Sequence, residues 1–435
     1  MDMDIEKRTL RKITWRIVPF IMILCLIAYI DRVNIGFAAI TMKEDLGFIA
    51  SILGFGAGIF FLGYFLFEVP SNIILHMIGA RIWITRVMIT WGIIAGGMAF
   101  VESSTSFYVM RFLLGVAEAG FFPGIILYLS YWFPARNRAG VIALFMAAAP
   151  IATAIGSPIS AALLEMHGIL GLAGWQWMFL IEAFPAVILG VVVFFYMTDR
   201  PEKATWLKQD EREWLVHTMQ LENAGKDKQQ HHSIIRGLAN PRVLALAMVY
   251  FGTSAGLYTL GIWAPQIIKE LGVSSMTVGL LNAIPPVVSV IAIILWSRHS
   301  DKTNERTWHV ALACLIAATG LVIAASTNSM LGLIASLTIV NVGISCSKPP
   351  LWSMPTVFLS GTAAATGIAT INSIWNLGGF AGPAMIGWVK DQTGSFTGGL
   401  YFVAGLLILS TILTLILSFT QKNKVSSAEL SNLSS

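Results

Sequence analysis

The chain has 435 residues, of which 56% are hydrophobic and 12% are charged, and its formal net charge is +5. Soluble domains carry about 25% charged residues, so this composition excludes an ordinary soluble protein and favours one that lies in the lipid bilayer. The positive charge does not predict a nucleic-acid partner, because the basic residues form short clusters between apolar runs.

Long apolar runs recur along the whole sequence. A membrane-spanning helix needs about 20 mostly apolar residues, and this criterion predicts twelve spans in two groups of six. The expected fold is therefore an all-α membrane protein built from two pseudo-symmetric six-helix bundles. The predicted spans are 14–40, 50–76, 82–101, 105–132, 139–165, 177–198, 242–268, 276–297, 307–326, 330–353, 360–388 and 398–420.

A charged segment separates the two groups and sets the domain boundaries. They are 1–198 for the N-terminal bundle, 199–241 for a central loop, 242–420 for the C-terminal bundle and 421–435 for a tail. Within the loop, three apolar residues near one face predict an amphipathic helix. These residues are Leu207, Leu215 and Met219.

The distribution of basic residues predicts the orientation in the membrane. Most Lys and Arg residues fall in the two tails, the central loop and the short loops on the same side. Only Lys43, Lys269 and Lys390 fall in connections on the other side. Because cytoplasmic loops carry an excess of Lys and Arg, both termini and the central loop are predicted to be cytoplasmic.

Two adjacent charges, Asp31 and Arg32, lie deep within the first predicted span. Asp31 is 12 residues from Lys43, roughly 18 Å along a helix, so neither charge easily reaches water by snorkelling. A charge at the centre of a spanning helix costs on the order of 3 kcal/mol. Consecutive residues point about 100° apart, so we expect Asp31 and Arg32 to have different partners.

The fourth predicted span supplies candidate partners in RFLLGVAEAGFFPG. Arg111 and Glu118 are seven residues apart, so they share one face about 10 Å from each other, at the depth of Asp31. Gly115 and Ala119 form a small surface that lets another helix approach. A buried carboxyl can exchange a proton when its surroundings change, and an Arg side chain fits a carboxylate in bidentate fashion. The alternative is a pair of static salt bridges, Asp31–Arg111 and Arg32–Glu118.

Uncharged polar residues at similar depth can complete a binding pocket or can simply pack helices together. They are Tyr29 and Asn34 in the first span, Tyr64 in the second, and Asn372 and Asn376 in the eleventh. Two further ionisable residues within spans, Glu182 and Lys348, favour a structural interpretation and leave a functional one open.

Several site classes are excluded by spacing and context. The three cysteines lie in apolar runs and no Cys/His cluster has zinc-ligand spacing, so no metal site is predicted. No Walker-type loop is present, which argues against ATP. GTSAG at 252–256 matches the hydrolase pattern G-x-S-x-G, but it lies in a long apolar helix and not in the required strand–turn–helix, so no enzyme is predicted.

The chain combines two groups of six predicted helices with the Asp–Arg–x–Asn motif of the first span and the segment RFLLGVAEAGFFPG of the fourth. In these features it resembles the major facilitator superfamily. Four further segments are similar to segments of its anion:cation symporter branch, and this resemblance extends over essentially the whole chain. The segments are WFPARNRAGVIALF, GWQWMFLIE, LWSMPT and DQTGSF. The resemblance implies uptake of a small organic anion, such as tartrate, a sugar acid or 4-hydroxyphenylacetate, through the bacterial inner membrane. It implies coupling to protons with no other cofactor, and we expect a monomer in the lipid bilayer.

The resemblance also implies residue roles. Asp31 and Glu118 would carry protons, and Arg32 and Arg111 would bind the carboxylate of the anion. The remaining substrate contacts would come from Tyr29, Asn34, Tyr64 and an Asn of the eleventh span. The gating loops would hold Arg81 after the second span and Asp301, Lys302 and Arg306 after the eighth.

The gating-loop signature of the family, Gly-x-x-x-Asp-Arg-x-Gly, is imperfect in this chain. Asn72 and His76 replace the Gly and the Asp in the first half, and Ser297 and Asn304 replace glycines in the second. These departures bear on how the gate is held closed. They do not change the expectation that the protein is a transporter.

Two alternatives to anion uptake remain at this point. One is export of organic acids or drugs, which differs in the direction of flux. The other is a membrane sensor that binds an acid without moving it, although the predicted central loop is small for a signalling output domain.

Overall fold

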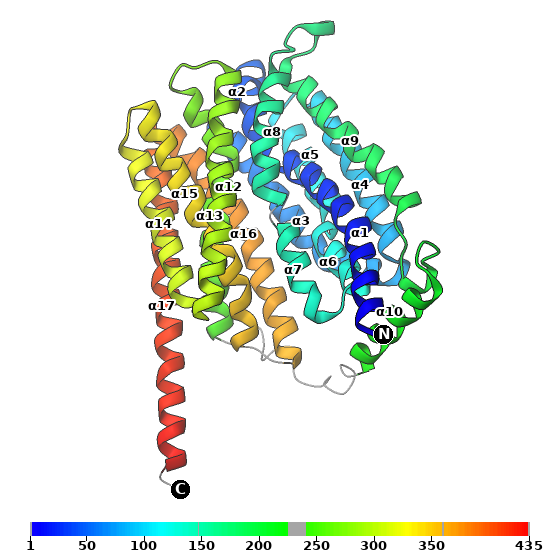
Figure 1. The fold of residues 1–435 in the computed structure, drawn as a ribbon. Helices are drawn as coiled ribbons and strands as arrows, with labels where there is room; N and C mark the ends of the chain where they lie inside the picture. Colours follow the sequence, from blue (N-terminus) through cyan, green and yellow to red (C-terminus); the bar gives the residue numbers. More distant parts are fainter. Residues whose placement is uncertain (1, 147, 225–240, 359–360, 434–435) are drawn as a thin grey trace. The chain divides into compact units, whose positions relative to one another are not determined.

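The computed structural model describes residues 2–146, 148–224, 241–358 and 361–433, and within them every regular element is a helix (Figure 1). The α-helices are α1 (Asp2–Val33), α2 (Ile35–Leu46), α3 (Ala50–Ile78), α4 (Ala80–Gly97), α5 (Ser104–Glu118), α6 (Phe121–Trp132), α7 (Ala135–Met146), α8 (Ala148–Leu164), α9 (Gly174–Tyr196), α10 (Gln209–Ala224), α12 (Pro241–Lys269), α13 (Ser275–Thr303), α14 (Thr307–Ser326), α15 (Met330–Phe358), α16 (Gly361–Thr393) and α17 (Thr397–Leu433). Three short 3-10 helices join them: η1 (Met98–Phe100), η2 (Ile169–Gly171) and η3 (Pro201–Lys203).

Ten segments of the described residues are long and apolar enough to cross a membrane, which confirms the all-α membrane fold. They are Ile5–Leu46, Ala50–Leu75, Ala80–Phe100, Ser104–Trp132, Gly174–Tyr196, Pro241–Lys269, Ser275–Thr303, Thr307–Ser326, Met330–Met354 and Thr397–Phe419. The predicted fifth span falls on α7 and on α8, which is a shorter apolar helix, and the predicted eleventh falls mainly on α16. Residue 360 of that span lies outside the described residues.

The chain divides into two compact units. Unit 1 comprises Met1–Phe48 and Ile59–Gln230, and unit 2 comprises Ile49–Gly58 and His231–Ser435. In unit 1, α9 packs against α1, α2, α4 and α8. In unit 2, α12 packs against α16 and α17, and α14 packs against α15 and α17. Buried aliphatic and aromatic side chains fill both units, as in the cluster around Tyr250, whose hydroxyl donates to the carbonyl of Leu351 at 2.9 Å.

Local sequence signals set several helix ends. The α5 helix begins after Ser103, whose hydroxyl accepts the backbone N–H of Ser106 at 3.2 Å, an N-cap of the usual Ser type. The α2 helix stops at Gly47, whose φ of +66° lies in the left-handed region that favours glycine. Helices therefore start and stop where short polar residues and glycine permit.

Within the predicted central loop the structure has the helix α10, and residues 225–240 of that loop lie outside the described residues. Leu207, Leu215 and Met219 are all buried, as the amphipathic pattern predicts. On α10, the buried Glu211 pairs with Lys12 at 2.7 Å and Arg8 at 2.9 Å, both at the start of α1. These contacts fasten the helix to α1.

The electrostatic environment of Glu211 favours its charged form. Burial alone would raise the pKa of this carboxyl, but the hydrogen bond from Lys12, the N–H of Lys208 and the nearby charge of Arg8 hold it below its usual range.

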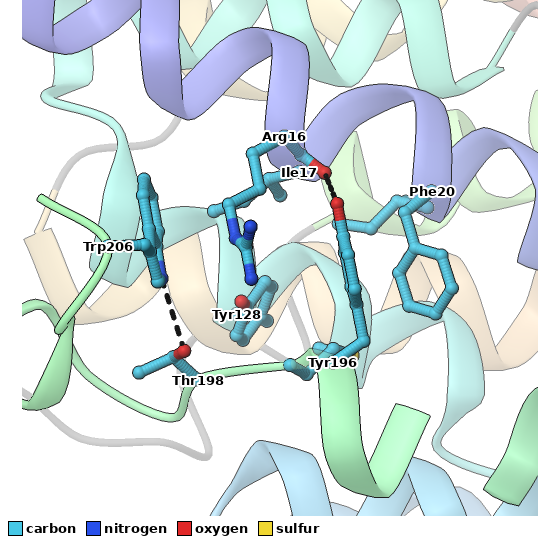
Figure 2. A pocket seen from close by; sticks show the side chains of 9 residues that line it. Arg16, Ile17, Phe20, Tyr128, Tyr196, Thr198 and Trp206 are labelled. Carbon is cyan, nitrogen blue, oxygen red and sulfur yellow. Dashed lines mark hydrogen bonds between the residues drawn. The ribbon is translucent and has the colours of Figure 1, made fainter. Parts of the chain in front are cut away.

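A second link joins α1 to the segment after α9. The guanidinium of Arg16 lies between two aromatic rings, 4.6 Å from the centroid of Tyr196 and 4.9 Å from that of Trp206 (Figure 2). The Tyr196 hydroxyl donates to the carbonyl of Arg16 at 3.0 Å. This arrangement is explained by cation–π attraction and needs no ligand.

Candidate functional site

One span of unit 1 is broken within its apolar run, where Ala119 and Gly120 separate α5 from α6. At Asn34, between α1 and α2, the backbone stays in the right-handed helical region with φ −59° and ψ −28°, so α1 continues into α2 as one span. The break after α5 requires glycine, because φ at Gly120 is +86° and a Cβ there would lie 2.0 Å from Ser71 Oγ. The Ser71 hydroxyl donates to the carbonyl of Ala119 at 2.6 Å, so the backbone group freed by the break has a partner. Broken helices of this kind commonly build transporter binding sites.

The break after α5 and the junction of α1 with α2 lie beside the predicted charges inside the unit. Arg32 lies one residue before the end of α1, and Glu118 is the last residue of α5. Arg32 Nε donates to Glu118 Oε1 at 2.7 Å, and Glu118 and Arg111 are each only 1% exposed. Of the two salt bridges considered from the sequence, Arg32–Glu118 is therefore present.

Aromatic side chains line the two guanidinium groups. The Arg32 guanidinium lies 5.1 Å from the ring centroid of Tyr64, 5.6 Å from Tyr29 and 5.7 Å from Phe60. The Arg111 guanidinium lies 5.2 Å from the same Phe60 ring. The structure thus brings together Tyr29, Tyr64 and both predicted anion-binding arginines, around a phenylalanine that the sequence did not single out.

Asp31 has a different partner from the one considered. Its Oδ2 accepts the indole N–H of Trp91 at 2.9 Å, and its Oδ1 is buried without a hydrogen-bond partner among the described residues. It makes no ion pair in the described part of the chain. An isolated charge in such a place is costly, so the surroundings of Asp31 favour a neutral, protonated carboxyl.

Asn34 points toward a buried carboxyl on α9. Asn34 Nδ2 donates to Glu182 Oε2 at 3.0 Å, and the hydroxyl of Ser160 donates to Glu182 Oε1 at 2.6 Å. Asn34 was predicted to contact substrate; in this structure its amide holds Glu182. Glu182 lies in the interior of unit 1, where it is 6% exposed.

Gly115 allows the close contact that its motif predicts. A Cβ at this position would lie 2.0 Å from the carbonyl oxygen of Phe60 on α3. The α5 backbone therefore touches the α3 backbone between Arg111 and Glu118. This contact fixes the charged face of α5 against the aromatic residues of α3.

The predicted residues of the eleventh span lie in unit 2. Asn372 and Asn376 are on α16, and Asn376 is 2% exposed. Asn376 Nδ2 donates to the carbonyl of Asn372 at 3.2 Å, one turn earlier. This contact belongs to the packing of α16 itself.

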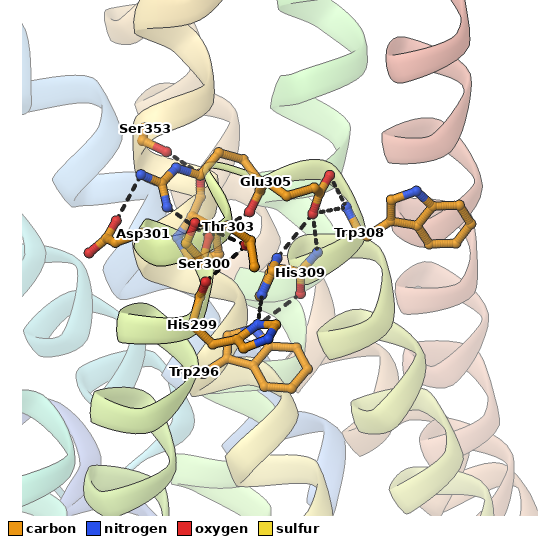
Figure 3. Close-up of polar contacts among 11 residues, drawn as sticks. Trp296, His299, Ser300, Asp301, Thr303, Glu305, Trp308, His309 and Ser353 are labelled. Atoms are coloured by element: carbon orange, nitrogen blue, oxygen red, sulfur yellow. Dashed lines mark hydrogen bonds and ion pairs between the residues drawn. The ribbon is translucent and has the colours of Figure 1, made fainter.

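In each unit, a predicted gating arginine pairs with a carboxylate. In unit 1, Arg81 Nε lies 3.6 Å from Asp199 Oδ2, and the Arg81 backbone N–H donates to Asp199 Oδ1 at 2.9 Å. In unit 2, Arg306 pairs with Asp301 at 2.7 Å (Figure 3), and Lys302 is exposed. Asp199, 123 positions after His76, supplies a carboxylate to the first loop from outside its motif.

In unit 2, beside the Arg306–Asp301 pair, two imidazole groups and a carboxylate lie in hydrogen-bond contact (Figure 3). This cluster was not predicted from the sequence. His299 Nδ1 and His309 Nε2 are 2.8 Å apart, and His309 Nδ1 is 3.0 Å from Glu305 Oε2. Burial alone would raise the pKa of Glu305, but the backbone N–H groups of Trp308 and His309 and the imidazole hold it below its usual range. Glu305 thereby caps the first turn of α14.

Other contributors were also missed from the sequence. Trp91 and Ser71 read as ordinary members of apolar helices, and nothing in their spacing marks them. Gly120 in the middle of a span is a usable signal, because glycine there points to a break or a close contact. Among the described residues no group of three or more His, Cys, Asp or Glu could hold a metal ion.

Comparisons of the sequence with known proteins agree on one family. Residues 21–383 match the model of the Major Facilitator Superfamily. A protein of Agrobacterium vitis named "Putative tartrate transporter" is 72% identical over 420 residues, which cover 97% of each chain. A "Quinolone resistance transporter" of Acinetobacter baumannii is 40% identical, covering 95% of this chain and 96% of its own.

Solved structures agree at the level of the fold. A crystal structure of a D-xylose-proton symporter superposes with a TM-score of 0.74 at 15% identity, covering 92% of this chain and 97% of its own. At that identity the likeness shows the fold alone. Since its relatives are named as transporters, the protein is a non-enzymatic, multi-pass membrane transporter. The chain belongs to the major facilitator superfamily.

Proposed function

We propose that this transporter takes up a small organic anion together with protons, and that tartrate is the first candidate substrate. The observation that carries the proposal is the buried group in unit 1, in which Arg32 and Arg111 face one ring and Arg32 is bound by Glu118. The 72% identity to relatives named for tartrate supports the choice of substrate.

The two arginines suit an anionic substrate. A guanidinium stays charged at any physiological pH and donates two parallel hydrogen bonds to a carboxylate. Two such groups match the two carboxylates of tartrate. Tyr29 and Tyr64, beside Arg32, can bind the hydroxyl groups of the substrate.

Glu118 gives a physical link between proton and anion. Its carboxylate occupies the place on Arg32 that a substrate carboxylate would take. Protonation of Glu118 weakens that ion pair and frees Arg32 for the substrate. With Asp31 neutral, two arginines, a doubly charged anion and one protonated Glu118 leave no net charge, which lowers the cost of crossing the bilayer interior. Glu118 and Asp31 are therefore the proposed proton carriers.

The test is uptake by the purified protein in proteoliposomes, with a panel of organic acids and with or without an imposed pH gradient. We expect tartrate or a related acid to accumulate above its external concentration when the outside is acidic. Equal uptake with and without the gradient for every acid in the panel would refute proton coupling.

One relative favours a second candidate, export. The name of the 40% identical "Quinolone resistance transporter" suggests removal of a drug from the cell. Reversing the pH gradient and adding a fluoroquinolone to the same proteoliposomes separates the two. Gradient-driven quinolone movement without tartrate movement would replace our proposal with export.

The distribution of basic residues supports an inner-membrane location with both termini in the cytoplasm. Reporter fusions at each terminus test this orientation.

A further inference from the structure

Glu182 is a buried carboxyl that the proposed mechanism does not yet use. It lies on α9, is 6% exposed and belongs to the span Gly174–Tyr196. In the described residues it forms no ion pair. Taking an unpaired carboxylate out of water costs several kcal/mol, and binding a proton removes that cost.

The helices packed against α9 supply no cation to Glu182. On α4, Arg81 pairs with Asp199 and the Arg86 guanidinium lies 4.7 Å from the ring of Trp83. The sequences of α8 and η1 contain no charged residue.

The other two neighbouring helices bring one acidic residue near Glu182 and no free cation. On α2, the charged residues are Lys43, Glu44 and Asp45 in its last turns, and Asp45 accepts from Trp175, seven residues before Glu182 on α9. On α1, Arg32 is bound by Glu118, whereas Asp31 lies close enough for its charge and that of Glu182 to repel. Two carboxylates cannot both stay ionised cheaply in one dry site.

The partners of Glu182 suit both of its protonation states. Ser160 and Asn34 donate to its two oxygens, at 2.6 Å and 3.0 Å, when it is ionised. When it is protonated, the Ser160 hydroxyl can accept instead, and so can the amide oxygen of Asn34. Arg32, the partner of Glu118, can only donate. Glu182 is thus held by groups that permit a proton to come and go.

Asn34 connects this carboxyl to Asp31. It lies at the junction of α1 and α2, three residues after Asp31 and on the same side of the helix. Asn34 Oδ1 and Asp31 Oδ1 are both buried acceptors without a hydrogen-bond partner among the described residues. A proton on Asp31 would supply a hydrogen-bond donor in a region where both of these buried oxygens lack one.

We propose that Glu182 is an additional proton-binding site of the transporter, joined to Asp31 through Asn34 at the junction of α1 and α2. A proton adds to the carboxylate to form the carboxyl group, whose O–H donates to Ser160 or Asn34, and the same proton leaves when the cycle returns. This inference rests on the proposed proton-coupled function. It adds one proton to those carried by Asp31 and Glu118.

The first test measures coupling with Glu182→Gln, which keeps the shape and removes the titratable group. With the interior one pH unit more alkaline, each coupled proton multiplies the equilibrium accumulation of labelled tartrate about tenfold. We expect the variant to accumulate about tenfold less than the parent while still exchanging internal for external tartrate. Glu102→Gln, at an exposed carboxyl, is the control and should match the parent.

The outcomes of this test separate the two proposals. A parent that ignores the pH gradient overturns the proposed function itself. A parent that responds to the gradient and a Glu182→Gln variant that accumulates equally well overturn the role of Glu182 alone.

The second test uses the unaltered protein and does not depend on the variant folding. In proteoliposomes, dicyclohexylcarbodiimide reacts with protonated carboxyls in apolar surroundings: the O–H adds across a C=N bond, nothing leaves, and the residue gains the mass of the reagent. Mass spectrometry of peptides should find Glu182 modified without added substrate, whereas Glu118 should react only when its ion pair with Arg32 is broken. Absence of modification at Glu182 at every pH that supports transport overturns the proposal.

Discussion

Replacing Gly115 by Ala tests whether the contact between α3 and α5 positions the site. The added Cβ would lie 2.0 Å from the carbonyl oxygen of Phe60, where ordinary contact begins at 3.4 Å, so the helices must part by roughly 1.4 Å. Overpacking of this kind costs about 1–3 kcal/mol. The same shift moves Arg111 and Glu118 relative to Tyr64, and misplacing reacting groups by about 1 Å can cost about a hundredfold in rate.

The assay for this variant combines stability and transport. Thermal unfolding in detergent should show a lower Tm for Gly115→Ala, and tartrate uptake in proteoliposomes should fall further than the loss of folded protein explains. Gly140→Ala is the matched control, because a Cβ at Gly140 meets no atom of the described residues within 4 Å. In that helix, Ala should be neutral or stabilising by up to about 1 kcal/mol.

A Gly115→Ala variant with the Tm and the uptake of the parent would refute the reasoning. It would mean that α3 and α5 are not held as closely as the structure places them. Loss of Tm with full uptake per folded molecule would retain the contact but reject its role in positioning the charges.

Three further predictions concern the buried and paired carboxyls. Glu118→Gln should lower the accumulation of tartrate about tenfold at one unit of pH difference while retaining exchange, and unchanged accumulation would remove Glu118 from the proton path. Trp91→Phe deletes the donor to Asp31 and should lower the free energy of unfolding by about 1–3 kcal/mol; an unchanged Tm contradicts this. Because the pKa of Glu211 is held below its usual range, its contribution to stability is present above the unfolded value of about 4.3 and is lost as the pH falls through the lower folded value. The Tm difference between the parent and Glu211→Gln should therefore be present at neutral pH and vanish in acid, and a difference that does not depend on pH would contradict the assignment.

The buried charges of unit 1 were predictable because an ionisable residue within an apolar run is visible in any single sequence. The same holds for Gly115, whose position between Arg111 and Glu118 predicts a close helix contact that the structure confirms. Burial of Leu207, Leu215 and Met219 also follows from their spacing. These features depend on local sequence alone.

The partners of the charges were not predictable in the same way. Which residue faces Asp31 depends on how α4 is rotated about its axis. Nothing in the neighbouring sequence distinguishes Trp91 from any other tryptophan of a spanning helix. Hydropathy alone does not show the break at Gly120, because the flanking runs are apolar on both sides and join α5 to α6 in one span. Asp199 and Arg81 are more than a hundred residues apart in the sequence, so no local pattern predicts their contact.

The link between proton and anion is the central claim, and the equilibrium accumulation of tartrate as a function of the imposed pH gradient tests it most directly. With the parent protein in proteoliposomes and the membrane potential clamped at zero, the account predicts an accumulation ratio that rises by at least about tenfold for each unit of pH difference. A ratio that stays at one across all gradients, although tartrate still exchanges, would contradict it.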